Sequence, residues 1–511
     1  MDKHIIAAGD KTTVEAATEV LWLGGNAFDA AVAAVFTSMA AEPVLTGPGG
    51  AGHFMALPSG EKPVLFDFFA DMPGKNPAET DLDFFDIEVD FGAEQQKFHI
   101  GKGSVAVPGT VAGLFYVMKH LGRLETKDIM SPAIRVAKEG AALSEMQAYL
   151  IEILKPILLH DKEGADIYAP NGKLVRDGDK LIQPAMADFL DALSHEGAEL
   201  MYFGEVADRI VEMTGEGGLV TKEDLSNYEV KERRPFATDF LGHKVHLNPP
   251  PAMSGILIDF TLALLNQAVA SGDDINLTDV ALANGLTNES REKKLPEGIV
   301  ETSRGKLSTD PDFPEWVDRL IKRNISGSEN GAPYSRGSTT QVSILDKEGS
   351  AASVTTTNGE GCGYMVPGLG FMLNNMLGEE DLNPKGFHCH RSGNRLPSMV
   401  APTIITRNST PVLVTGSAGS NRIRSAIVQM IVEVIKGEMD IEEATIAPRL
   451  HVDGDTIQAE PGADEATLEE LSSFYKIHRW EKRNLYFGGA NSVTPEGGAG
   501  DRRRGGYAMV V

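Results

Sequence analysis

The sequence predicts a mixed fold of α-helices and β-strands, and three patterns support this prediction. Apolar residues recur at helical spacing over residues 12–41 and through much of 110–230. Residues 339–357 have the composition of a strand, a turn and a second strand, and residues 411–437 that of a strand, a glycine turn and a helix. The 511 residues, 42% of them hydrophobic, can bury a large core, and the length suits either two to four domains or one large α/β unit.

The N-terminal part is predicted to begin with two helices within residues 12–41. The first has one apolar face and ends at Gly24 and Gly25, and the second runs through small residues until Pro43. Two strands are expected next, in "LTGPGGAGHFMAL" and in "PVLFDFFADMP". Residues 249–251 are three prolines and must be extended, because proline continues neither a helix nor a central strand.

The composition changes sharply between about residue 288 and residue 337. This segment is polar, charged and rich in Gly, Ser and Asn, apart from a short amphipathic piece at 316–321, so we expect a flexible linker. The predicted hairpin follows, with its turn at residues 346–349. Thr339 therefore begins a strand directly where the linker ends.

The glycine turn Gly416–Gly419 is predicted to lead into a helix that Ser420 caps and Gly437 ends. Free N–H groups at such a turn attract negative charge, so the turn suits an oxyanion or another anion. A simple tight turn explains the same residues. The turn matches neither the dinucleotide fingerprint nor the P-loop.

The overall composition narrows the classes of molecule that the protein is expected to bind. The net charge is −26, from 73 acidic and 47 basic residues, which disfavours nucleic acid and anionic membranes and points to small molecules. The same acidity would also suit adaptation to salt. Two cysteines, no signal-like N-terminus and no stretch of about eighteen apolar residues predict a soluble, cytoplasmic protein without a disulfide framework.

Two further motifs suggest cofactors but carry little support. "HCH" places His388, Cys389 and His390 together, and in a strand only the two histidines would face one metal. No companion ligands with zinc-type spacing occur, so we expect no metal. "GPGGAG" would serve a nucleotide-dependent oxidoreductase, but the acidic residue that should follow a βαβ unit is missing. We therefore expect no cofactor.

Thr339 offers a different chemistry. A threonine hydroxyl is a poor nucleophile unless a base lies beside it. If the bond before Thr339 were broken, its new α-amino group, with an ordinary pKa of about 7.7–8.0, would supply that base on the same residue. Alternatively, threonines are frequent here because they favour strands.

A resemblance to a known family decides between these interpretations. The segment from Gly337 to Met376 resembles the small-subunit start of the gamma-glutamyltransferase family of N-terminal-nucleophile hydrolases. Further stretches resemble the family in the same order along nearly the whole chain: "VLWLGGNAFDAAVAA", "GPGGAGHF", "VPGTVAGL", "GEGGLVTKEDLSNYEV", "NPPPAMSGI", "APTII", "VTGSAGSNRI", "APRLH" and "GAGDRRRGG".

The resemblance implies an α+β fold, a four-layer αββα sandwich made as one precursor. Self-cleavage between Ser338 and Thr339 would give a large chain of residues 1–338, ending in the linker at about 288–337, and a small catalytic chain of residues 339–511. Together the two chains would form one compact domain.

The same resemblance implies roles for individual residues. Thr339 matches the nucleophile and Thr357 the second threonine, whose hydroxyl supports it. Gly419 and Ser420 match the paired glycines whose amides form the oxyanion hole. Asn358 matches the substrate-binding asparagine only if one residue is deleted.

The substrate-binding pattern departs from the family. Phe69, or its neighbour, stands where the family has the arginine that clamps the α-carboxylate of a gamma-glutamyl group, and phenylalanine cannot replace that charge. Arg395, Arg422 and Arg424 are candidates to replace it.

Other residues that match the family's contacts to the glutamyl group also differ from the family pattern. Ser398 retains one of the family's paired serines, while Pro397 replaces the other. The acidic ligand for the substrate's α-amino group is Glu379, Glu380 or Asp381.

We therefore expect a hydrolase or acyltransferase that works through an acyl-Thr339 intermediate. Its substrate would be a small amide or a gamma-glutamyl-like compound such as glutathione, with water or an amine as acceptor. Alternatives are a non-glutamyl amide, of the oxamate or cephalosporin type, or an uncleaved homologue that only binds a ligand. Processed chains of one precursor would be partners, as a homodimer or heterotetramer.

Overall fold

A computed structural model describes the protein except for residues 1, 91–94, 273, 295–306, 326–337 and 384. Helices and strands come in separate runs along the described chain, and neighbouring strands of the two largest sheets are antiparallel. The prediction of an α+β fold is confirmed.

The larger sheet contains seven strands within the described residues. In spatial order they are β22 (Tyr507–Val510), β1 (Ile5–Ala8), β11 (Thr339–Leu345), β12 (Ala351–Thr357), β2 (Ala51–Leu57), β3 (Val64–Phe68) and β8 (Lys231–Arg233). The predicted hairpin of residues 339–357 is confirmed as β11 and β12, and both expected N-terminal strands are present as β2 and β3. Strand β1, which sequence analysis did not predict, pairs with β11.

The second large sheet has six strands in the described part of the chain: β21 (Gly498–Ala499), β20 (Ser492–Val493), β14 (Thr410–Thr415), β13 (Thr403–Arg407), β10 (His243–Leu247) and β9 (Phe236–Phe240). The remaining described strands form four small sheets: β15 (Ser417–Ala418) with β19 (Gly489–Ala490), β16 (Leu450–Asp453) with β17 (Thr456–Ala459) and β18 (Lys476–Arg479), β4 (Phe85–Asp90) with β5 (Gln95–Ile100), and β6 (Ala141–Ala142) with β7 (Lys180–Leu181).

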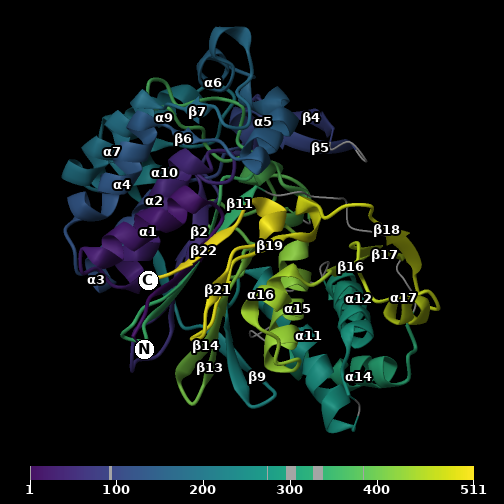
Figure 1. The fold of residues 1–511 in the computed structure, drawn as a ribbon. Coiled ribbons are helices and arrows are strands. Elements are labelled where there is room, and N and C mark those ends of the chain that lie inside the picture. The colour runs from purple at the N-terminus through teal and green to yellow at the C-terminus, as the bar shows by residue number, and fades with distance from the viewer. Residues whose placement is uncertain (1, 91–94, 273, 295–306, 326–337, 384) are drawn as a thin grey trace.

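The helices of the first part of the chain lie on one side of the strands and those of the later part on the other (Figure 1). The first group comprises α1 (Lys11–Trp22), α2 (Ala27–Ala41), α3 (Thr110–Leu121), α4 (Thr126–Glu139), α5 (Glu145–Leu158), α6 (Lys162–Tyr168), α7 (Pro184–Glu196), α8 (Glu199–Tyr202), α9 (Glu205–Thr214) and α10 (Lys222–Ser226). The second comprises α11 (Met253–Ala270), α12 (Leu277–Lys294), α14 (Phe313–Ile321), α15 (Arg422–Ile435), α16 (Ile441–Ile446) and α17 (Glu465–Leu471).

Local capping explains where the first two helices begin. The Asp10 side chain accepts from the amide of Thr12 at the start of α1. Asn26 and Asp29 form a capping box at the start of α2. The small residues of α2 let it lie wholly buried, so the two helices predicted in residues 12–41 are confirmed.

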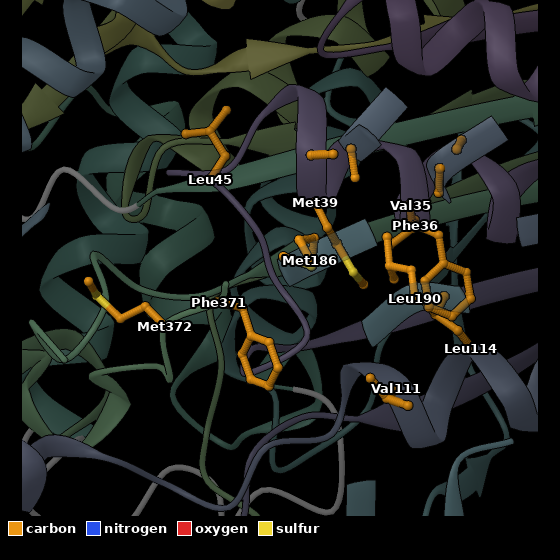
Figure 2. Close-up of a cluster of buried hydrophobic side chains, with 14 of the residues drawn as sticks. Val35, Phe36, Met39, Leu45, Val111, Leu114, Met186, Leu190, Phe371 and Met372 are labelled. Carbon is orange, nitrogen blue, oxygen red and sulfur yellow. The ribbon is translucent and has the colours of Figure 1, made fainter. Parts of the chain in front are cut away.

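Apolar residues form three clusters, because the central strands are buried on both faces. In β1, Ile6 packs into the cluster beneath α1–α7, while Ile5 faces the cluster between the two large sheets. A third cluster lies beneath α11, α12 and α15. Figure 2 shows part of the first cluster, where Met39 of α2 and Met186 of α7 lie near Phe371 and Met372.

The described parts of the expected linker contain two α-helical stretches and a short 3-10 helix at Leu307–Thr309. Residues 288–294 belong to α12, and α14 contains the predicted amphipathic piece. Residues 295–306 and 326–337 of the expected linker lie outside the described residues.

Helix α11 is long and apolar enough, by length and composition, to cross a membrane. Its sequence includes Asp259, Asn266 and Gln267, so α11 is not a continuous stretch of apolar residues. Most of α11 is buried inside the protein, and a core helix of a soluble protein passes the same test.

Candidate active site

Thr339 and Thr357 lie side by side at the end of the β11–β12 hairpin. They are register partners, the first residue of one strand and the last of the other. The Thr357 hydroxyl donates to the carbonyl oxygen of Ser338, and the amide of Gly359 donates to that hydroxyl at 3.0 Å. The second threonine therefore contacts the peptide bond at which cleavage is predicted.

A small pocket opens beside this pair. Its wall contains six of the residues that the sequence singled out: Phe69, Thr339, Thr357, Glu379, Asp381 and Ser420. Four apolar residues complete it: Leu382, Met399, Val400 and Ile423. The pocket is thus apolar on one part of its wall and acidic on another.

The two carboxylates of the acidic part of the wall, Glu379 and Asp381, lie in different environments. Burial raises the pKa of Glu379 well above its ordinary value, and the nearby charges of Glu360 and Asp381 raise it further. Asp381 is instead held by donors, since Ser420 Oγ donates to it at 2.6 Å and Asn421 Nδ2 at 2.9 Å. Arg291 Nη2 lies 3.7 Å from the same carboxylate.

The loop at Gly419 and Ser420 has a backbone suited to exposing amides. Gly419 has φ +114° and Ser420 has φ +51°, and the left-handed region is one that serine rarely adopts. Within the described residues, neither amide donates to a backbone or side-chain acceptor. The prediction that Ser420 caps α15 is wrong, because Asn421 is the N-cap and the Ser420 hydroxyl is bonded to Asp381.

Phe69 is buried just after β3 and lies against the ring of His53, with centroids 5.8 Å apart. Its backbone is fixed from both sides. Its amide donates to Asp67 at 3.0 Å, and its carbonyl accepts from Tyr228 Oη at 2.7 Å and from Arg395. These contacts hold the phenyl ring in the pocket wall.

The three arginines suggested as replacements for the missing clamp point elsewhere. Arg395 pairs with Asp71 at 2.9 Å, Arg422 Nε donates to the carbonyl of Tyr486, and Arg424 donates to Asn288. In the described part of the chain, the pocket wall contains no lysine or arginine.

Five other predicted residues lie outside this wall, among them Gly419, which precedes Ser420. Asn358 lines a second cavity, together with Glu360 and Met372, and donates to the Met372 carbonyl at 3.3 Å. Ser398 is buried next to Met399, and its carbonyl accepts from Met253. Ser338 is buried at the predicted cleavage point, while Glu380 is exposed.

Comparison with known proteins places the chain in a family. A family model described as "Gamma-glutamyltranspeptidase" matches residues 13–511, almost the whole chain. The chain belongs to the gamma-glutamyltranspeptidase family. The resemblance inferred from the sequence is thereby confirmed, as is the prediction of an enzyme of hydrolase or transferase type.

The similar proteins found in this comparison are named for different enzyme activities. A glutathione hydrolase proenzyme from Escherichia coli is 29% identical, over 92% of this chain and 84% of that protein. An acylase proenzyme from a Pseudomonas strain is 28% identical, over 94% of this chain and 88% of that protein. The crystal structure of a cephalosporin acylase from Bacillus halodurans has the same fold, with a TM-score of 0.81 and 22% identity, over 99% of this chain and 96% of that one.

In this gamma-glutamyltranspeptidase-family chain the "HCH" motif is a turn, not a strand as assumed from the sequence. His388 Nε2 bonds the Gly103 carbonyl at 2.8 Å and His390 Nε2 the Leu382 carbonyl at 3.1 Å. The two rings therefore serve different backbone groups. No cluster of three potential ligands suited to a metal occurs among the described residues.

Sequence analysis missed Glu42, which supports strand β11 next to Thr339 in this family member. Glu42 is fully buried and accepts from Thr340 Oγ1 at 2.7 Å and from Thr13 Oγ1 at 2.8 Å. A Cβ at Gly9 would lie 2.2 Å from its Oε2, so a larger residue there would displace the carboxylate. The signal available in the sequence was an acidic residue, Glu42, directly after the mostly apolar helix α2.

Replacing Glu42 with glutamine is expected to flatten the pH dependence of stability between pH 5 and 8. Burial, then the charge of Asp10, raises the pKa of Glu42 from 4.5 to about 8. The folded state keeps a proton on Glu42 that the unfolded state releases above pH 4.5. The contribution of this proton to the free energy of unfolding is therefore complete below pH 4.5 and is lost as the pH rises toward 8. Thermal unfolding midpoints at several pH values check this. Glu15→Gln, on the exposed face of α1, is the control and should keep the wild-type slope.

Proposed function

We propose that the chain cleaves itself between Ser338 and Thr339 and becomes an N-terminal-threonine hydrolase or acyltransferase. The observation that carries this proposal is the Thr339–Thr357 pair, lying at the pocket wall with the Thr357 hydroxyl on the Ser338 carbonyl. The chain before the cut would be residues 1–338, including the linker at about 288–337, and the chain after it residues 339–511. Together they would make a four-layer αββα sandwich, which the placement of helices on both sides of the strands supports (Figure 1).

The free amino group of Thr339 then acts as the base. It takes the hydroxyl proton as Oγ attacks the substrate's amide carbon, and it returns the proton to the departing amine. The acyl group remains as an ester on Thr339 until water or a second amine takes it. Thr357 supports the hydroxyl of Thr339.

Stabilisation of the transient oxyanion is assigned to the amides of Gly419 and Ser420, whose lack of acceptors among the described residues supports this role. Two backbone N–H donors of this kind suit an oxyanion. Each such donor typically lowers the activation barrier of the reaction by about 3 kcal/mol. The positive φ of Gly419 and Ser420 would keep the two N–H groups clear of the helix that follows.

The substrate we propose is a small amide whose acyl part is apolar or carries an amine. Phe69, Met399 and Ile423 offer apolar contacts. Glu379 or Asp381 would receive an ammonium group, while Glu380, which is exposed, is a weaker candidate. A gamma-glutamyl group fits the amine side of this arrangement, so glutathione remains a candidate substrate.

A second candidate is a non-glutamyl amide, of the oxamate or cephalosporin type. It is favoured by Phe69 and by the lack of a cation in the described pocket wall, since a glutamyl α-carboxylate would have no charged partner there. The relative named as an acylase agrees with this alternative.

Two measurements test the proposal. Denaturing electrophoresis should give two bands that sum to 54.9 kDa, with Edman sequencing of the smaller one starting Thr-Thr-Gln-Val. A single band from active-condition protein would support an uncleaved ligand-binding homologue instead. Hydrolysis of gamma-glutamyl anilides, oxamate and simple acyl amides would then identify the acyl group.

Phe69→Arg is expected not to create strong glutathione activity by itself. Pro397 still replaces the first serine of the family's pair, and the acidic ligands also differ from the family. Release of glutamate from glutathione, compared between wild type and variant, measures this effect. A large gain would mean that the pocket is otherwise ready for glutamate.

We further propose a cytoplasmic enzyme without metal or cofactor, whose processed chains assemble as a homodimer or heterotetramer. The strongly negative net charge supports small molecules as its partners, and neither nucleic acid nor membranes.

A further inference from the structure

Three buried polar side chains join two residues of the pocket wall from behind. Phe69 and Val400 both belong to that wall. The amide of Phe69 donates to Asp67 Oδ1 at 3.0 Å, and the carbonyl of Val400 accepts from Asn248 Nδ2 at 2.7 Å. His53 lies between these side chains, with Nε2 3.2 Å from Asp67 Oδ1 and Nδ1 3.0 Å from Asn248 Nδ2. Asp67, His53 and Asn248 thus form a continuous polar bridge behind the wall.

The strand register places His53 at the centre of this bridge. His53 of β2 and Asp67 of β3 are register partners, so their side chains stand on the same face of the sheet. On its other side His53 is the register partner of Thr355, two positions before Thr357. The histidine therefore lies between the hairpin of the threonine pair and the strand that leads to Phe69.

The partners of His53 assign the hydrogen of its ring. The guanidinium groups of Arg233 and Arg395 lie 2.6 and 3.5 Å from the oxygens of Asp67. Asp67 is therefore a carboxylate that only accepts, and His53 Nε2 carries the hydrogen. His53 Nδ1 faces an amide N–H of Asn248 and accepts it. His53 is only 2% exposed, so either lost bond would leave a buried polar group unpaired.

We propose that His53 is a positioning residue that fixes the spacing of Phe69 and Val400 and thereby sets which acyl groups the pocket accepts. This inference rests on the proposed function. The imidazole ring is a rigid spacer, because its two nitrogens keep one separation and one direction. The described wall does not include His53, so the residue acts through its neighbours.

The test compares acyl groups on one processed enzyme preparation. The probes are the p-nitroanilides of acetic, butyric and phenylacetic acid. In His53→Phe, which keeps a ring but loses both bonds, the preference in kcat/KM between the best and the poorest anilide should fall about tenfold, the scale on which an apolar pocket senses a methylene group. The loss should come mainly from KM, and self-cleavage should keep its wild-type rate, since it does not use the spacing of the wall.

His246→Phe is the matched control. His246 of β10 is also a buried histidine, and its Nε2 lies 3.0 Å from Thr406 Oγ1, away from the pocket wall. This variant should keep the wild-type preference. A preference is a ratio measured on one preparation, so partial unfolding of a variant does not change it.

The outcomes separate the two proposals. If wild type is active and His53→Phe keeps its preference, only this inference fails, even if kcat and self-cleavage both fall. If wild type is uncut or hydrolyses none of the anilides, the proposed function fails. Crystal structures of the uncleaved Thr339→Ala chain with and without His53→Phe then decide the inference, because an unmoved Phe69 and Val400 would overturn it and a change in their spacing would support it. Should His53→Phe not fold, Asn248→Leu breaks the bridge at its other end and is tested in the same way.

Discussion

Thr339→Ala is expected to remain one chain of 54.9 kDa and to have no detectable turnover. The substitution removes the only hydroxyl that both proposed reactions use, first against Ser338 and then against substrate. The fold should be retained, because Thr339 lies at the very end of β11 and keeps Thr357 as its register partner. Electrophoresis, substrate hydrolysis and circular dichroism measure the three outcomes.

Thr339→Ser is the matched control, because it keeps the hydroxyl and, once cleaved, the amino group. It should be cleaved and active, if more slowly, since serine lacks the methyl group that fixes the side-chain rotamer of threonine. Cleavage or turnover in carefully purified Thr339→Ala protein would exclude Thr339 as the nucleophile.

Asp501→Ala is expected to destabilise the fold by about 3–5 kcal/mol, the cost of removing one partner from a buried ion pair. Asp501 Oδ2 lies 2.6 Å from Arg449 Nη2, and Oδ1 lies 3.3 Å from Arg503 Nη1. These two cations hold the pKa of Asp501 below its usual range although burial opposes this. Without the carboxylate, two buried guanidinium groups lose their shared partner.

The same substitution should also weaken catalysis, because Asp501 accepts from the Ala490 amide at 2.9 Å. Ala490 pairs with Ser417 of β15, immediately before Gly419. Thermal unfolding is best measured in the Thr339→Ala background, where a single chain unfolds. Glu465→Ala, which breaks an exposed pair with Arg479, should leave the midpoint unchanged. An unchanged midpoint in Asp501→Ala would show that the network adds little.

Much of the fold was predictable because local patterns and tertiary packing agree. The apolar periodicity of residues 12–41 and the turn at residues 346–349 place α1, α2, β11 and β12 where they are found. Strand β1 was missed because its four apolar residues lack a pattern of their own and gain strand structure only by pairing with β11 and β22.

The candidate site was predictable where it depends on neighbours along a strand. Thr339 and Thr357 follow from the hairpin register. Glu42 does not, because its hydrogen bond with Thr340 joins residues 298 positions apart in the chain. The roles of Ser420 and of "HCH" were misjudged for a related reason, since left-handed backbone at Ser420 and His388 replaces the expected cap and strand.

The strand order of the larger sheet has a consequence for the mature protein. The β11–β12 hairpin lies between β1 and β2, and β22 lies on the outer side of β1, so strands from before and after Ser338 are interleaved. The two fragments would thus be topologically locked together, and neither could leave or be exchanged without dismantling the sheet. Scission would alter one strand end and leave the architecture intact.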